Sequence, residues 1–213
     1  MTGNETNILA IAAKGGFLMI VLLVISIAAV AIIIERLINL KRLSGSNREL
    51  MDEALAALEN DQPERAVQIC EDKADAPISG LIIEAVDNLH APLHELETIM
   101  ELEANKQGYK IQKNLGALSS FAAVAPLIGF LGTVTGMVKV FMKIGETGGG
   151  VDIGLLANGI WEALITTIGG LTVGIVSILF YNYLIGRTEK ITAELEEGLG
   201  KLMISIRRLR HED

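Results

Sequence analysis

The sequence is poor in cysteine, proline and aromatic residues. Its 213 residues include one cysteine, one tryptophan and four prolines, and aromatic residues make up 4% of the chain. Since Cys70 has no second cysteine to pair with, an intrachain disulfide is excluded. Nucleic-acid binding calls for basic patches interleaved with aromatic side chains, and none is present in a chain of net charge −8.

The sequence also lacks the signatures of enzymes. No nucleophile–base pair or nucleotide-binding fingerprint is evident, and the glycines between 129 and 136 have no following Lys-Ser/Thr as in a phosphate loop. His90 and His94 have helical spacing for a metal, but Pro92 lies between them and no third ligand is evident. We therefore predict no enzyme activity, no metal site and no other cofactor.

Charge is nearly missing from three long stretches. Half of the residues are hydrophobic and the mean hydropathy is +0.44, which is high for a soluble domain. The runs are residues 15–34, residues 114–138 and, apart from Glu162, residues 153–186. About 20 apolar residues cross the hydrocarbon core as a helix, so each run is long enough to span a membrane. The many alternating segments of a membrane barrel do not appear.

The first run is predicted to be an uncleaved membrane anchor. The segment before it carries only Glu5 and Lys14, and the apolar run continues through 32–34, past a small-residue pattern at 29–31. Basic residues follow the run at Arg36, Lys41, Arg42 and Arg48. Such clusters lie on the cytoplasmic side, which puts the N-terminus outside and, after three crossings, the C-terminus inside.

The expected fold is an all-α integral membrane protein with long cytoplasmic helical extensions. The predicted segments are an outer N-terminal segment (1–14), a membrane helix (15–35), a cytoplasmic helical domain (36–113), a second membrane helix (114–143), an outer loop (144–153), a third membrane helix (154–186) and a cytoplasmic C-terminal helix (187–213). Pro63 suits the start of a helix through Cys70. Because no strong helix breaker separates Leu93 from Ala125, one continuous helix is predicted there.

The C-terminal helix is predicted to be amphipathic over Thr188 to Arg210. Its apolar face holds Ile191, Leu195, Leu199, Leu202 and Ile206.

Glu162 is the single charged residue within the third run. A carboxylate there costs on the order of 3 kcal/mol or more, so it must face protein, a partner or water. We interpret it as a functional residue, with a role in assembling a functional ring included. The alternative is a structural acid that is hydrogen-bonded to a neighbouring subunit.

Hydroxyl groups accompany this acid. Thr166 lies one turn inward from Glu162 and Thr167 lies beside it, while Thr133 and Thr135 on the second run offer facing hydroxyls. This pattern suits either a polar passage or tight helix packing. Membrane threonines often bond to the backbone of their own helix, so none of them indicates a pore by itself.

The second run carries helix-packing signals. Pro126 is expected to kink the helix or loosen its hydrogen bonding. Gly132 and Gly136, like Gly129 and Thr133, are spaced by four, and Gly170 adds a small contact point on the third run. Small residues at this spacing let helix backbones approach closely in lipid.

Three motifs in combination resemble the MotA/TolQ/ExbB proton channel family. They are Lys14-Gly15-Gly16 with Ile34-Glu35-Arg36-Leu37, the segment Ala125 to Met137, and Gly159 to Thr167 followed by Gly170 to Ile175 and Tyr181-Asn182. The likeness covers nearly the whole chain. Three crossings with one large cytoplasmic insertion are most similar to the ExbB branch and next to the TolQ branch, whereas the MotA branch has an extra helix.

The resemblance implies a homopentamer in the bacterial inner membrane. Its second and third helices would line a pore that holds the membrane helices of ExbD-like or TolR-like subunits, whose Asp carries the proton. Thr133 and Thr167 match the two pore threonines of the family, and Glu162 matches its third-helix glutamate. The proline that many members have after the third-helix glycines is missing from Val173 to Val176.

The function implied is a proton-driven motor subunit that delivers work to a TonB-like protein. The alternatives are a TolQ-like subunit that acts on a TolA-like protein, and a structural membrane scaffold that conducts nothing. Sodium is a further possible coupling ion, since the Thr and Glu residues do not distinguish it from a proton.

Overall fold

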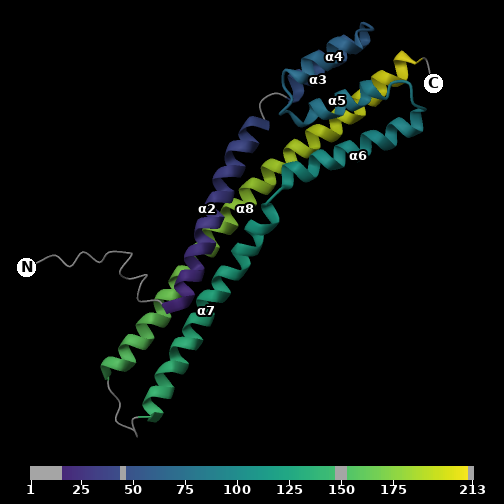
Figure 1. The fold of residues 1–213 in the computed structure, drawn as a ribbon. Helices are drawn as coiled ribbons and strands as arrows, with labels where there is room; N and C mark the ends of the chain where they lie inside the picture. Colours follow the sequence, from purple (N-terminus) through teal and green to yellow (C-terminus); the bar gives the residue numbers. More distant parts are fainter. Residues whose placement is uncertain (1–15, 44–46, 147–152, 211–213) are drawn as a thin grey trace, which may run out of the picture. The chain divides into compact units, whose positions relative to one another are not determined.

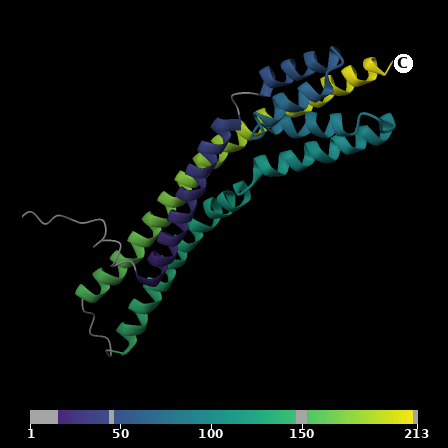
Figure 2. The ribbon, with the colours of Figure 1, turned by 45° about the horizontal axis from the view of Figure 1, so that its top comes forward.

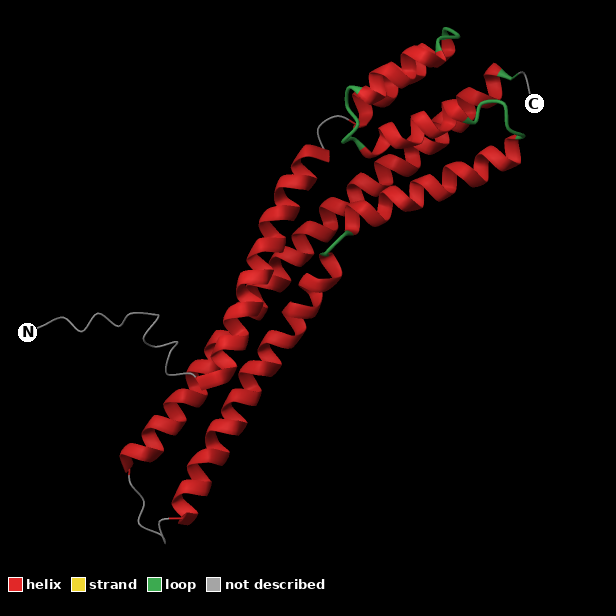
Figure 3. Ribbon diagram, in the orientation of Figure 1, coloured by secondary structure: helices red, strands yellow, loops and turns green. Residues whose placement is uncertain are grey.

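The computed structural model describes residues 16–43, 47–146 and 153–210. Within these ranges the chain consists of helices and the turns between them (Figure 3), as predicted. The helices are α2 (Gly16–Leu43), α3 (Asn47–Glu59), α4 (Pro63–Glu71), α5 (Pro77–Asp87), α6 (Leu93–Gln112), α7 (Leu115–Glu146) and α8 (Ile153–Leu209) (Figure 1). The predicted segment 1–14 and most of the predicted outer loop lie outside the described residues.

Three helical stretches in the described part of the chain are long and apolar enough to cross a membrane. Their apolar portions belong to α2, α7 and α8, where the sequence predicts membrane helices. Helix α2 continues beyond residue 35 to Leu43, and α8 runs without interruption from Ile153 to Leu209, so both helices extend past the predicted ends of their membrane segments.

The chain divides into two compact units. The apolar unit comprises residues 1–34 and 114–182, so its described helices are α2 up to Ile34, α7, and α8 up to Asn182. The polar unit comprises residues 35–113 and 183–213, which include α3 to α6 and the remaining parts of α2 and α8.

In the apolar unit, α7 and α8 pack side by side and antiparallel (Figures 1 and 2). Residues further along α7 contact residues earlier in α8. The close pairs are Pro126 with Gly174, Gly129 with Gly170, Gly136 with Ala163, and Val140 with Gly159. Helix α2 runs parallel to α8, because Gly16 lies at Glu162 while Met19 and Leu22 lie at Gly169.

The other faces of the apolar unit expose large apolar side chains. On α8 these include Leu164, Ile168, Leu171, Ile175 and Ile178. Such a surface needs lipid or other protein chains to cover it.

The polar unit has an ordinary helical core. Leu81, Leu96 and Met100 are fully buried, and so is the predicted apolar stripe of α8 at Ile191, Leu195, Leu202 and Ile206, while Leu199 is half-buried. Pro63 and Pro77 stand in the first turns of α4 and α5, where the missing N–H has no helical partner to lose.

The prediction of one continuous helix from Leu93 to Ala125 is wrong. Helix α6 ends at Gln112 and α7 begins at Leu115, because Lys113 is extended (ψ 138°) and Asn114 is left-handed (φ 65°). Asparagine adopts the left-handed conformation more readily than most residues, since its short polar side chain bonds locally. Asn114 was therefore the breaker that the sequence contained.

Arginines hold both ends of α6. The buried Arg36 donates from Nη1 to the carbonyls of Lys110 and Ile111, each at 3.4 Å, in the last turn where carbonyls lack helical partners. Arg210 donates to the carbonyl of Ala91 at 2.7 Å and to that of Leu89, just before α6 begins. Side chains from outside α6 thus bind the carbonyls of its last turn and of the turn that precedes it.

Cys70 is predicted to be unreactive in the folded protein. The residue is fully buried, and burial raises the pKa of its thiol from 9.0 to about 11, against the opposing effect of its hydrogen bond with Ser79. Because the thiolate is the nucleophile, iodoacetamide at about pH 8 should alkylate Cys70 roughly a hundredfold more slowly than in denaturant. Mass spectrometry of the alkylated fraction measures this, and equal rates in both states would contradict it. Since the folded-state pKa is the higher one, the stabilisation from this thiol is complete below about pH 9 and is lost as the pH rises through about 11.

Candidate functional site

The candidate site is the seam along which α7 and α8 meet. Gly129, Gly132 and Gly136 of α7 are all buried against α8. A methyl group on Gly170 would lie 2.5 Å from the Ala125 carbonyl oxygen and 2.8 Å from Gly129 Cα. The two backbones therefore approach so closely that only residues without a side chain fit between them.

Pro126 lies inside α7 and faces the same seam. A methyl group on Gly174 would lie 2.5 Å from the Pro126 ring, so this glycine makes room for the proline. Because proline has no N–H, the Ala122 carbonyl loses its usual helical donor. That carbonyl points toward Gly174, with its oxygen 3.2 Å from the position of an added methyl group.

Two of the predicted site threonines bond to their own helices. Thr166 is fully buried beneath Gly132 and donates to the carbonyls of Ala163 at 2.8 Å and Glu162 at 3.1 Å. Thr133, on α7, donates to the carbonyl of Phe130 at 2.6 Å. These bonds match the alternative that the sequence left open, in which membrane threonines satisfy themselves locally.

Thr167 behaves differently. Its hydroxyl donates across the seam to the Gly129 carbonyl of α7, at 2.9 Å. Among the described threonines of the apolar unit it is the one whose hydroxyl bond crosses to another helix. The side chain is half-buried, so it stands at the edge of the seam rather than within it.

Glu162 lies at the opposite edge. Its Oε1 is 3.5 Å from Nζ of Lys139 on α7, and it also lies against the backbone of Gly16 at the start of α2. Gly16 has a φ of +68°, and a methyl group there would collide with the Glu162 carboxylate. The Glu162 carboxylate, carried by α8, therefore contacts both α7 and α2, and its side chain is 32% exposed.

Helical geometry explains why the Glu162 carboxylate and the Thr167 hydroxyl lie on different sides of α8. Glu162 and Thr167 are five residues apart, which is roughly 140° around α8. Lys139 and Thr133 are six residues apart, which is roughly 120° around α7. The seam glycines lie between the members of each pair. The structure thus brings Thr166 to Gly132 and Thr167 to Gly129, but it puts Glu162 on the side of α2.

Sequence reasoning did not find the contact between Lys139 and Glu162. The antiparallel hairpin contained the signal. In an antiparallel pair of helices, the numbers of facing residues have a constant sum. Gly129 faces Gly170 and Gly136 faces Ala163, which gives a sum of 299. Lys139 and Glu162 give 301, so the same pairing places them close together. No group of three or more His, Cys, Asp or Glu side chains that could hold a metal ion occurs among the described residues.

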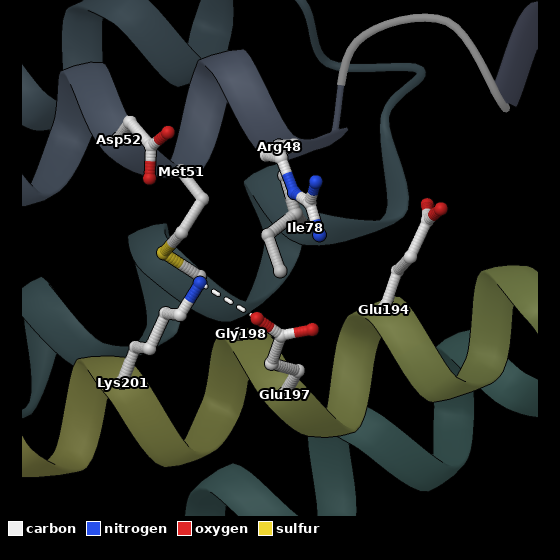
Figure 4. Close-up of a pocket in the computed structure, with 8 residues that line it drawn as sticks. All are labelled: Arg48, Met51, Asp52, Ile78, Glu194, Glu197, Gly198 and Lys201. Carbon is white, nitrogen blue, oxygen red and sulfur yellow. Dashed lines mark ion pairs between the residues drawn. The ribbon is translucent and has the colours of Figure 1, made fainter.

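The polar unit has a small pocket of mixed charge where α8 passes α3 and α5 (Figure 4). Met51 and Ile78 close over Gly198, which has no side chain to obstruct them. At the rim, Lys201 and Glu197 form an ion pair of 2.7 Å, with Arg48 nearby. Asp52 and Glu194 are the other charged residues of the lining.

Comparison with known proteins decides the family. The model of the MotA/TolQ/ExbB proton channel family matches residues 73–197, which include α7 and every seam residue of α8. The chain belongs to this family. The matched range thus contains the glycine pairs, the threonines and the intramembrane acid of the α7–α8 hairpin.

Relatives within the family extend over most of the chain. A putative biopolymer transport protein, ExbB-like 3, of Synechocystis is 30% identical over 91% of this chain and 92% of its own length. ExbB-like 1 of the same organism is 32% identical over 81% of this chain and 68% of its own length. Biopolymer transport protein ExbB of Neisseria meningitidis is 30% identical over 83% of this chain and 84% of its own length. Together with its three apolar helices, this indicates that the chain is a multi-pass membrane protein of this family.

Proposed function

We propose that the chain is the channel-forming subunit of an inner-membrane motor that uses the proton motive force to energise TonB-dependent transport across the outer membrane. The observation that carries the proposal is the match to an ExbB-like relative over nine-tenths of both chains. A match of this extent includes the first helix and the polar unit, and not the shared hairpin alone.

The seam supports a role in proton movement. Thr167 holds a hydroxyl at its edge, bonded to a backbone carbonyl that any incoming donor would compete for. A hydroxyl both donates and accepts, so it can exchange that bond for one to a protonatable group or to water. Glu162 is the one acidic residue within the three apolar runs of this chain. It is paired with Lys139. We infer that the acid that takes up and releases the proton belongs to another chain.

The assembly that fits is a homopentamer around the membrane helices of ExbD-like or TolR-like subunits. The exposed apolar faces of α2, α7 and α8 supply the surface for neighbouring copies and lipid. The basic cluster after the first run supports a periplasmic N-terminus and a cytoplasmic C-terminus. Work would pass through the partner subunits to a TonB-like protein.

The complex purified from native membranes tests the proposal in two measurements. Native mass spectrometry in detergent should give five copies of this chain with a substoichiometric partner. In phosphatidylethanolamine–phosphatidylglycerol vesicles, an imposed pH gradient should be dissipated faster than in empty vesicles, as followed by an enclosed pH-sensitive dye. A complex with another copy number, or vesicles no leakier than empty ones, would overturn the assembly or the channel respectively.

A TolQ-like role is the second candidate, because the family model that matches residues 73–197 includes TolQ proteins. The co-purifying partners separate the two: ExbD-like and TonB-like chains support transport, whereas TolR-like and TolA-like chains support envelope constriction. A scaffold that conducts nothing predicts instead that Glu162→Gln assembles and works normally.

A further inference from the structure

An ion pair within the apolar unit joins the two helices of the hairpin. Lys139 Nζ and Glu162 Oε1 are 3.5 Å apart, with side-chain exposures of 69% and 32%. Charged groups inside a membrane-spanning bundle are tolerated mainly when they are paired. Either residue alone would leave an unbalanced charge, while the pair leaves none.

The position of this pair matters as much as its charge. Glu162 lies against Gly16 of α2, whereas Thr167 bonds to Gly129 at the other edge of the α7–α8 seam. Thr166 and Gly170, both buried, stand between the two edges. No described contact links the carboxylate to the Thr167 hydroxyl.

We propose that Lys139 is a positioning residue that holds the Glu162 carboxylate on the α2 side of the seam, away from the threonine edge. Glu162 then contributes to proton-driven work as one member of a neutral ion pair that joins three helices. It does not itself take up or release the proton. This inference rests on the proposed function, since it assigns a role within the same channel.

Exchanging the two charges tests the inference, because it keeps the pair and removes the acid from position 162. The singles Lys139→Gln and Glu162→Gln should each reduce proton flux at least tenfold in the vesicle assay. The double variant Lys139→Glu with Glu162→Lys should recover to within about threefold of the unsubstituted complex. Lys139→Arg, which keeps the charge, is the matched control and should remain near full flux.

The outcomes are distinguishable. If the double variant assembles but stays as inactive as Glu162→Gln, the carboxylate is needed at position 162 itself and the inference fails. If Lys139→Gln keeps full flux, Lys139 does not position Glu162 and the inference also fails. If the unsubstituted complex shows no flux, the proposed function fails instead.

Gly16 provides an independent variant. A side chain there would collide with the Glu162 carboxylate, so Gly16→Ala should push Glu162 from the pair and reduce flux as Lys139→Gln does. Combined with Glu162→Gln, Gly16→Ala should add little further loss, because both changes act on the same contact. Since a side chain at φ +68° is also strained, the decisive outcome is the single variant: full flux with Gly16→Ala would contradict the three-helix contact.

Discussion

Replacing Thr133 and Thr167 together by valine should abolish proton-driven work while the protein still inserts into the membrane. Valine has nearly the shape of threonine but no hydroxyl, so the change removes the bond from Thr167 to Gly129 and the hydroxyl of Thr133. We expect proton flux to fall about tenfold or more, which corresponds to a barrier raised by ~1.4 kcal/mol or more.

The measurement is dye-reported flux in vesicles, with membrane content checked by quantitative blotting. The matched control is Thr135→Val with Thr172→Val, which also removes one hydroxyl from each helix. Both control threonines are exposed and bond to their own helices, Thr135 to the Leu131 carbonyl and Thr172 to that of Ile168. If the control loses as much flux as the test pair, or if the test pair keeps it, the threonine edge is not the proton route.

Replacing Gly170 by valine should prevent the hairpin from closing. The new Cβ would stand 2.5 Å from the Ala125 carbonyl oxygen and 2.8 Å from Gly129 Cα. Both are backbone atoms, so no side chain can rotate away and α7 and α8 must separate. Overpacking of this kind costs about 3 kcal/mol, a large part of the stability of a typical domain.

Gly186→Val on the same helix is the control for this change. Apart from its chain neighbours and the nearby backbone of its own helix, nothing lies within 4 Å of a methyl group added at Gly186, so the control has the same chemistry without the collision. We expect the Gly170 variant to lose most of its detergent-stable complex on size-exclusion chromatography, and the control to lose none. Equal yields would show that the two helices are not in close contact at Gly170.

The sequence was informative wherever a pattern is local. Proline at position 63 predicted a helix start because its fixed φ suits a first turn. The spacing of Ile191, Leu195, Leu202 and Ile206 predicted a buried stripe because α-helical periodicity depends on neighbours alone. The break at Asn114 escaped notice because one left-handed residue ends a helix without any proline or glycine.

Which side chains meet could not be read in the same way. Thr133, Thr166 and Thr167 look alike in sequence, yet only the last of them donates to another helix, because Thr167 projects past the seam toward Gly129. The contact of Lys139 with Glu162 likewise follows only when α7 and α8 are paired residue by residue.

By itself the sequence determined the three apolar helices, the charged helical segments between them and the family motifs, since composition and spacing are properties of the chain alone. Only the tertiary structure decided that the acid and the threonine of α8 lie at opposite edges of one seam. The reason is geometric: the pairing of two antiparallel helices fixes both the facing residue and the side of contact. No single helix contains that information.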